Sequence, residues 1–388
     1  MTPPRTLAKN LPSTHHVVVL GAGYGGLMTA LRLAPHTRVT LVDPAGHFTE
    51  RVRLHERASG RPDVTHPLDG FLRGTGITHV AARATRLDLA AREVHTDNGQ
   101  VLHYDRLVHA LGSRTAPTPT PDEGTSTPVE GTPANGGRAY TTESAAELHK
   151  RLLEGPGTLA VVGGGLTGVE LATELAESHS GWRIGLHTEG IVGASLSDRG
   201  RAHVRTALVA RGVRIEEGHR VAGPDAVDAD VVLWAASMVP ATALAKAAGI
   251  AVDRTGRITV DTALRSVSHP EVYAVGDSAA AHTEAAGPLR MACATALPTG
   301  AHAAVALTAD LRGEEPPPLR FGYLLQCVSL GRRDGVIQPV RADDSPRARI
   351  LTGRPAAYVK EQVVLSTVRM LRLASRHPSA LRYVPGIG

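Results

Sequence analysis

Two glycine-rich turns carry the clearest chemical signal in the sequence. The first, VVVLGAGYGG, spans Val17–Gly26, and the second, VVGGGLTGVE, spans Val161–Glu170. Each has the spacing Gly-x-Gly-x-x-Gly directly after an apolar run. These glycines permit a tight turn and a close approach of the backbone to a pyrophosphate, which the first N–H groups of the following helix bind. We therefore expect nucleotide contacts from two sets of residues, Gly21, Ala22, Gly23, Tyr24, Gly25 and Gly26 in the first turn and Gly163, Gly165 and Gly168 in the second.

In each unit, the residue at the end of the strand that follows the glycine turn would contact the ribose of a bound nucleotide. In the first unit that strand closes on Asp43, 22 residues after Gly21, where a carboxylate can accept the ribose hydroxyls. In the second unit Thr188 stands in the equivalent place, followed by Glu189. Threonine does not repel a 2′-phosphate, yet no arginine follows at once to bind one. The sequence therefore leaves NADH and NADPH open, and a second turn that no longer binds a nucleotide is the alternative.

Apolar runs and helical spacing place these turns in an alternating pattern of strands and helices. The runs predict strands over 17–20, 38–42, 79–89, 101–111, 159–162, 183–187 and 230–234. Apolar residues at helical spacing predict helices over 27–33, 143–153 and 166–178. This alternation is typical of an α/β fold with two Rossmann-like dinucleotide-binding domains.

The second dinucleotide-binding domain is expected to be inserted in the first. Residues 1–114 and 251–318 would form the first domain, and 138–250 the second. Residues 115–137 are rich in Pro, Thr and Gly, which predicts a flexible loop. Residues 319–388 would form a small α+β region that ends in an amphipathic helix.

Composition bounds the class of protein. With 388 residues and 42% apolar content the chain suits a globular protein of two domains or slightly more. A net charge of +5, from 42 basic and 37 acidic residues, argues against a nucleic-acid partner. Cys293 and Cys327 form no CxxC pair and the 19 histidines show no metal spacing, so we expect neither a redox dithiol nor a metal. No apolar signal segment is seen at the N-terminus, which favours a cytoplasmic location.

Four further motifs, GITHVAARATRLD, YDRLVHALGS, VYAVGDSAA and DVVLWAASMVP, extend the pattern of the two turns. With them the chain resembles the two-dinucleotide-domain flavoprotein reductases, and most closely the type II NADH:quinone oxidoreductases and related NAD(P)H dehydrogenases. The resemblance covers nearly the whole chain. It implies that the first turn holds FAD and that the second holds NADH or NADPH. The further FAD contacts that it implies are Asp43, the backbone of Ala84, Gly112, Gly276 and Asp277, the last holding the ribityl chain.

A helix near the flavin is expected from Pro298 to about Leu311, because proline favours the first turn of a helix. Backbone amides near Leu297–Gly300 would then stabilise the negative charge of reduced flavin by up to ~2 kcal/mol. Quinone-type members of the resembled family often carry glutamines in this segment, whereas this chain reads ATALPTGAHAA. The identity of the electron acceptor therefore stays open.

Few side chains are candidates for catalysis. The resemblance implies that Glu170 positions the nicotinamide or relays a proton to the acceptor, and a carboxylate stabilised only by the helix dipole is the alternative. The segment FTERVRLHE brings Arg51, Arg53 and His55 together. Arg51 would reach the FAD phosphate or line the acceptor pocket, and a solvated charged helix is the alternative.

The terminal segment PAAYVKEQVVLSTVRMLRLASRH predicts a helix over 356–373 with Val359, Val363 and Met370 on one face. From Ser345 onward eight Lys and Arg residues stand against one acid. This pattern is compatible with peripheral contact with an anionic membrane surface. A helix that covers the fold or a homodimer partner is the favoured alternative.

Together these features predict an FAD-dependent NAD(P)H dehydrogenase that passes electrons to a quinone-like small molecule. A tailoring flavoenzyme that oxidises or reduces a small metabolite, and a flavin-binding redox sensor with little turnover, are the alternatives. Without a dithiol, the chain is not expected to reduce disulfides.

Overall fold

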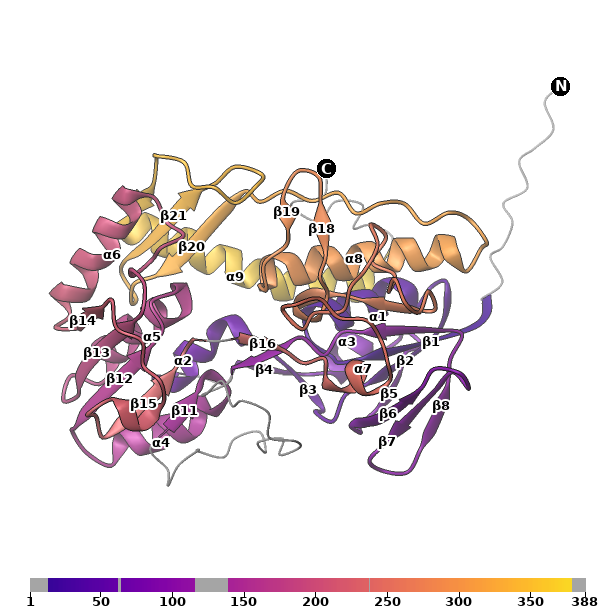
Figure 1. Ribbon diagram of the computed structural model, residues 1–388, viewed down its shortest axis with the longest axis horizontal. Helices are drawn as coiled ribbons and strands as arrows, with labels where there is room; N and C mark the ends of the chain where they lie inside the picture. Colours follow the sequence, from indigo (N-terminus) through magenta and orange to yellow (C-terminus); the bar gives the residue numbers. More distant parts are fainter. Residues whose placement is uncertain (1–12, 62–63, 116–138, 237, 379–388) are drawn as a thin grey trace.

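The computed structural model describes residues 13–61, 64–115, 139–236 and 238–378. The segment predicted to be a flexible loop, 115–137, lies outside the described residues apart from Thr115. Two five-stranded parallel sheets form the centres of two domains, which lie side by side in Figure 1.

The first parallel sheet has the order β17-β9-β1-β2-β5. Its strands are β17 (Val272–Ala274), β9 (Arg106–His109), β1 (Ser13–Leu20), β2 (Thr37–Val42) and β5 (Thr78–Val80). Val17–Leu20 are fully buried, as expected for a parallel strand that is covered on both faces. Helix α1 (Tyr24–Leu33) follows the first glycine turn and crosses α8 (Cys293–Asp310). The helices approach closely because Gly25 and Gly300 meet at the crossing, where a side chain on Gly300 would collide with Gly25.

The second parallel sheet has the same arrangement of strands, and its segment of the chain is inserted between two segments of the first domain. Its order is β11-β15-β12-β13-β14, and β12 and β13 take the places that β1 and β2 have in the first sheet. The strands are β11 (Ala139–Thr141), β15 (Val231–Trp234), β12 (Thr158–Val162), β13 (Arg183–Thr188) and β14 (Arg214–Glu217), with helices α4 (Ala145–Leu153), α5 (Leu166–Ser178) and α6 (Asp198–Ala210). The first sheet resumes afterwards at β17, so the predicted α/β fold with an inserted second domain is confirmed.

Smaller elements link and cover the two sheets. A three-stranded antiparallel sheet, β6 (Ala84–Asp88), β7 (Glu93–Thr96) and β8 (Val101–His103), belongs to the first domain. Strands β10 (Ser113–Thr115) and β16 (Met238–Pro240) pair where the chain passes between the domains. The remaining short elements are β3 (His47–Thr49), β4 (Thr65–Pro67), β18 (His282–Thr283), β19 (Gly287–Pro288), α2 (Leu54–Ala58), α3 (Asp69–Leu72) and α7 (Ala243–Ala247).

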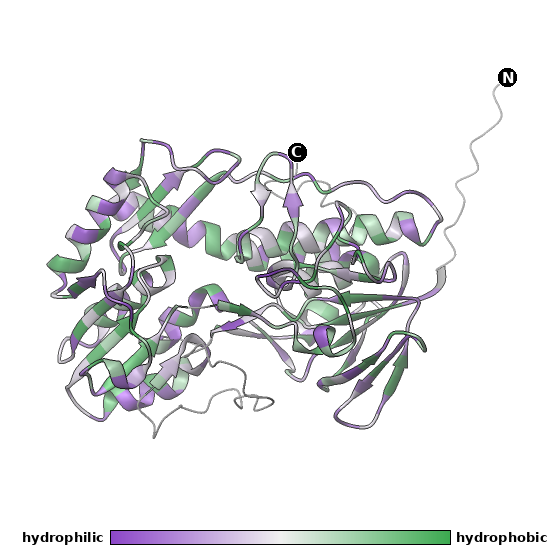
Figure 2. Ribbon diagram, viewed as in Figure 1, coloured by the Kyte–Doolittle hydropathy of each residue, from purple (hydrophilic) through white to green (hydrophobic). Residues whose placement is uncertain are grey.

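The C-terminal region joins both domains. Its antiparallel sheet, β20 (Leu325–Ser329), β21 (Gly335–Pro339) and β22 (Leu351–Thr352), adds Val328 and Val336 to the core of the second domain. Helix α9 (Gly353–Arg376) then runs across to the first domain, where Val368 and Leu371 join the other core. Figure 1 shows α9 spanning from the C-terminal sheet to α1, and Figure 2 shows the mixed hydropathy along its length.

The buried stripe of α9 differs from the predicted face. Val364, Thr367, Val368 and Leu371 are buried, whereas Val359, Val363 and Met370 are only half-buried. The difference arises because the helix packs against two domains, which a single amphipathic stripe in the sequence does not reveal. Within the described residues, no helix is both long and apolar enough to cross a bilayer.

Candidate active site

The first glycine turn is shaped for close approach of a ligand to its backbone. Gly21 has φ +98°, and its N–H donates to the carbonyl of Val42 (2.8 Å). A side chain on Gly26 would collide with the Gly21 carbonyl, so the start of α1 is held tightly against the turn. By contrast, a Cβ on Gly23, which caps α1, would meet no protein atom within 4 Å. The N-terminus of α1 is therefore accessible to a phosphate.

The structure places a fixed carboxylate beside this turn. Asp43 is half-buried at the end of β2. Its Oδ2 accepts the N–H of Ala22 (2.7 Å) and its Oδ1 accepts the N–H of Ala45 (2.8 Å). Ala84 begins β6 opposite Thr96 and is half-buried. Both oxygens of Asp43 are thus held by backbone N–H groups beside the turn, and the predicted contact with a ribose stays a prediction.

The Gly276-Asp277 motif contacts the chain just after Gly112, which lies in the connection between β9 and β10. Gly276 has φ +64°, and its N–H donates to Thr299 Oγ1 on α8 (3.0 Å). Asp277 Oδ2 accepts the hydroxyl of Ser113 (2.6 Å), the residue after Gly112. Asp277 Oδ1 is buried and has no hydrogen-bond partner among the described residues. A buried carboxylate oxygen requires a donor, and a ribityl hydroxyl of FAD would supply one, so the residues present fit this cofactor.

The helix beside this motif starts earlier than predicted. Helix α8 begins at Cys293, so Pro298 lies inside it and the prediction that Pro298 opens the helix is wrong. Proline there removes the bond to the Ala294 carbonyl and its ring crowds that carbonyl, while Gly300, two residues further on, packs closely against Gly25 of α1. In the first turn the N–H groups of Thr295 and Ala296 donate to the Ala292 carbonyl, so the amides that the helix itself does not use are those of Cys293 and Ala294, and not those near Leu297, which is buried within the helix.

The second glycine turn repeats the geometry of the first. Gly163 has φ +126° and donates to the carbonyl of His187 (2.8 Å), while a side chain on Gly168 would collide with the Gly163 carbonyl. Gly165 caps α5, and a Cβ on it would meet no protein atom within 4 Å. Thr188 ends β13 with its side chain against the turn, 2.8 Å from where a Cβ on Gly164 would lie. The second turn therefore fits a dinucleotide as the first does.

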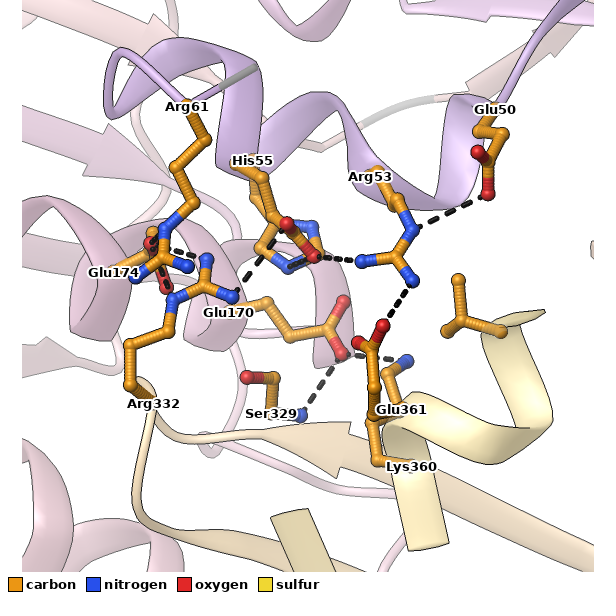
Figure 3. Close-up of polar contacts among 12 residues, drawn as sticks. Glu50, Arg53, His55, Arg61, Glu170, Glu174, Ser329, Arg332, Lys360 and Glu361 are labelled. Carbon is orange, nitrogen blue, oxygen red and sulfur yellow. Dashed lines mark hydrogen bonds and ion pairs between the residues drawn. The ribbon is translucent and has the colours of Figure 1, made fainter. Parts of the chain in front are cut away.

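Glu170 lies between the two domains in a buried ion pair. Its Oε1 is 2.9 Å from Nζ of Lys360 on α9 and accepts the N–H of Ser329 (3.0 Å), as Figure 3 shows. Burial would raise the pKa of Glu170, but Lys360, His55 and the Ser329 N–H together hold it below its usual value. Burial would likewise lower the pKa of Lys360, and the Glu170 carboxylate holds it above its usual value. Both groups are therefore charged at neutral pH, and Glu170 is not a simple helix-terminal carboxylate.

The charged segment before α2 is folded into the same region. Arg53 is buried and contacts Glu50 (3.2 Å), Glu56 (2.8 Å) and Glu361 (2.6 Å). His55 is buried, and burial lowers its pKa, so its ring is neutral at pH 7. The alternative of a solvated charged helix is therefore wrong for both residues.

Arg51 behaves differently from its two neighbours. Its side chain is 40% exposed and pairs with Glu143 at the start of the second domain (2.7 Å). This ion pair joins the two domains, and the predicted contact of Arg51 with an FAD phosphate stays a prediction.

The two cysteines lie near the site as protonated thiols. Burial raises the pKa of Cys293 to about 11 and raises the pKa of Cys327 as well. Lys360 is an electrostatic neighbour of both thiols, and Asp277 is a neighbour of Cys293. Lys360 Nζ also donates to the carbonyl of Cys327 (3.4 Å), so the Glu170–Lys360 pair lies beside β20.

Sequence reasoning missed Lys360, Ser113 and Thr299. Lys360 carried a usable signal, because it is one of four lysines in a chain with thirty-eight arginines. A lysine retained in so arginine-rich a chain suggests a site that needs a compact ammonium group. Ser113 and Thr299 carried no such signal, since hydroxyl side chains are common and their partners are distant in sequence.

Comparison with known proteins agrees with this geometry. The family model for pyridine nucleotide-disulphide oxidoreductases matches residues 15–306. An NADH dehydrogenase-like protein of Mycobacterium tuberculosis is 29% identical over 89% of this chain and 92% of its own length. A type II NADH:quinone oxidoreductase of Staphylococcus haemolyticus is 25% identical over 89% of this chain and 93% of its own.

Solved structures show the same fold at lower identity. NDH2 of Plasmodium falciparum, in complex with NADH, has a TM-score of 0.74 at 14% identity and covers 94% of this chain and 97% of its own. The sulfide:quinone oxidoreductase of Aquifex aeolicus has a TM-score of 0.71 at 19% identity, covering 94% and 93%. The resemblance inferred from the motifs is thereby confirmed. The chain belongs to the pyridine nucleotide-disulphide oxidoreductase family.

Proposed function

We propose that this chain is an FAD-dependent NAD(P)H dehydrogenase that delivers electrons to a quinone-like acceptor. The observation that carries the proposal is the pair of equivalent glycine turns, the first of which lies in the same domain as the buried, unpaired Oδ1 of Asp277. The relatives named as NADH dehydrogenase-like and NADH:quinone oxidoreductase proteins support the same reaction. FAD, when bound, would accept a hydride from NAD(P)H and pass electrons to the acceptor, while the protein positions the reactants and sets the electrostatic environment.

Different residues of the chain would bind the two nucleotides. The N–H groups at the start of α1 and the Asp43 carboxylate would bind the adenosine half of FAD. Asp277 Oδ1 would accept a hydrogen bond from the ribityl chain. The N–H groups at the start of α5 would bind the pyrophosphate of NADH or NADPH, with Thr188 facing the ribose.

We assign the Glu170–Lys360 pair to proton handling beside the acceptor. Reduction of a quinone consumes protons as well as electrons, and Lys360 Nζ is a protonated donor held in a buried position. Glu170 Oε1 accepts from Lys360 and fixes the direction of the ammonium group. Glu170 would therefore act through Lys360, by positioning the ammonium group that holds the proton.

A comparison of two acceptors tests this proposal. NADH oxidation by the purified flavoprotein is measured with menadione, whose reduction takes up protons, and with ferricyanide, which takes electrons alone. We expect Glu170→Gln to slow the menadione reaction ~100-fold or more while ferricyanide reduction stays within about threefold. Glu154→Gln, at a side chain that is 67% exposed, is the matched control. A wild-type protein that reduces ferricyanide but no quinone would overturn the assignment of the acceptor.

Contact with a membrane is a separate proposal. The buried stripe of α9 is already covered by the two domains, so a peripheral contact would use its exposed side chains Tyr358 and Leu373 and the neighbouring Leu351. Flotation with anionic liposomes tests this contact, and a Tyr358→Ser/Leu373→Ser variant that floats like the wild type would contradict it.

A further inference from the structure

A cationic cleft lies apart from both glycine turns. It has a volume of about 450 Å³ and opens between α2, the turn that follows β20 and the first three turns of α9. Two acidic side chains, Glu56 and Glu361, line it. Six cationic side chains line it as well, namely Arg53, Arg61, Arg332, Arg333, Arg354 and Lys360. The wall of the cleft is therefore strongly positive.

Acidic groups behind the wall hold three of these cations in place. Glu174 is 2.5 Å from Arg332 and 3.2 Å from Arg61, and Glu170 pairs with Lys360, as Figure 3 shows. The side chains of Glu174 and Glu170 are only 2% and 11% exposed, and neither lines the cleft. A guanidinium has five N–H donors, more than these carboxylates use, so donors remain for a ligand.

Arg333 and Arg354 have no acidic partner among the described residues, although both are exposed at the cleft. Arg354 lies in the first turn of α9, where a cation is repelled by the helix dipole. That first turn also contains no acidic residue, and its N-cap Thr352 makes no side-chain capping bond. The first N–H of the helix, that of Gly353, donates to Asp334 Oδ1 (3.0 Å), so the charge left without a partner at this end is that of the arginines, and an anion in the cleft would pair with both of them.

We propose that this cleft binds a phosphate group, carried on a small molecule or on a lipid. Arginine forks match the geometry of phosphate oxygens and form paired, charge-assisted hydrogen bonds with them. The volume exceeds that of one phosphate and falls in the range of small-molecule sites, so there is room for the group that carries it. The inference does not depend on the dehydrogenase activity proposed above.

Calorimetric titration with pyrophosphate tests the site, using FAD-loaded protein at constant ionic strength. Saturating NAD⁺ blocks the second glycine turn, where pyrophosphate would otherwise compete. We expect wild-type protein to bind and Arg333→Gln/Arg354→Gln to bind at least tenfold more weakly. The control Arg199→Gln/Arg254→Gln removes the same charge from exposed positions outside the cleft and should bind like the wild type. If NAD⁺ does not bind, pyrophosphate binding at the second glycine turn would be the same in both double variants, so any difference between them still reports binding in the cleft.

A second arm separates the two sources of phosphate. Vesicles of phosphatidylglycerol are compared with vesicles of phosphatidylcholine by sedimentation with the same variants. Pyrophosphate binding that depends on Arg333 and Arg354, without such dependence for vesicles, assigns a soluble ligand. Vesicle binding that depends on the two arginines assigns a lipid headgroup. If neither probe distinguishes the cleft variant from the control variant, the proposal is wrong.

Discussion

The buried pair of Glu170 and Lys360 gives the sharpest energetic prediction. The two charged atoms are 2.9 Å apart, and the Coulomb energy 332/(20 × 2.9) is about 6 kcal/mol at an effective dielectric constant of about 20. Desolvation offsets much of this energy in the intact pair. Removing one partner leaves the other charge buried and unpaired, at a cost of about 3–5 kcal/mol. Lys360→Met and Glu170→Gln should each destabilise the second domain by that amount at pH 7.

Urea unfolding followed by tryptophan fluorescence measures this effect, because Trp182 and Trp234 are buried in the second domain. The double variant should lose far less than the sum of the single variants, with a coupling free energy of about 2–4 kcal/mol. Lys246→Met, at an exposed lysine, is the control and should change stability by no more than ~0.5 kcal/mol. Additive losses in the double variant would refute the ion pair as the source of the effect.

The Glu170–Lys360 pair also predicts that the contribution of Glu170 to stability changes with pH in opposite directions in the wild type and in Lys360→Met. The folded pKa of Glu170 lies below its unfolded value, so its stabilising contribution is present above the unfolded pKa and is lost as pH falls through the folded pKa. In Lys360→Met burial dominates and raises the pKa of Glu170, so the stability deficit relative to wild type should grow from pH 4 to pH 7. A deficit that is constant over this range would contradict the assignment of charge.

Three further predictions concern the glycine turns, two histidines and nucleotide preference. Gly26→Ala should disrupt folding because its side chain would collide with the backbone, whereas Gly23→Ala should fold but lose FAD. The ratio of flavin to protein absorbance measures the loss of FAD, and equal behaviour of the two variants would contradict the geometry. Burial lowers the pKa of His109 and of His302 to about 4, so between pH 6.5 and 4 the unfolded chain binds more protons and stability falls on acidification by about 1.4 kcal/mol per pH unit for each histidine. The thermal midpoint for flavin release should therefore drop from pH 7 to pH 5, and an unchanged midpoint would refute this. Thr188→Glu should lower the NADPH to NADH ratio of kcat/KM at least tenfold, since its carboxylate would repel a 2′-phosphate, and an unchanged ratio would place the ribose elsewhere.

The repeated units of the fold could be predicted because their signals are local. Gly21 and Gly163 start turns whose apolar strands and following helices are contiguous in the sequence, and both sheets formed as expected. The start of α8 could not be predicted in this way. The preference of proline for a first helical turn was overridden by the contact of Gly300 with Gly25, residues 275 positions apart.

The residues of the candidate site likewise fall into those that local sequence motifs predict and those that they do not. Asp43 follows β2 directly and Asp277 comes three residues after β17, and their roles were inferred from motifs that are continuous in the chain. The Lys360 partner of Glu170 is supplied by α9, 190 residues away, and no local spacing in the sequence links the two. The neutral state of His55 likewise depends on its burial in the folded chain, which periodicity alone does not reveal.

The central claim is that one chain holds two nucleotides, FAD at the first turn and NAD(P)H at the second. An anaerobic absorbance titration of the purified flavoprotein with NADH, and separately with NADPH, tests it most directly. We predict that at least one of the two bleaches the bound flavin band with one equivalent per chain, and that Gly165→Val abolishes bleaching while the flavin stays bound. A flavin band that neither nucleotide bleaches would contradict the account.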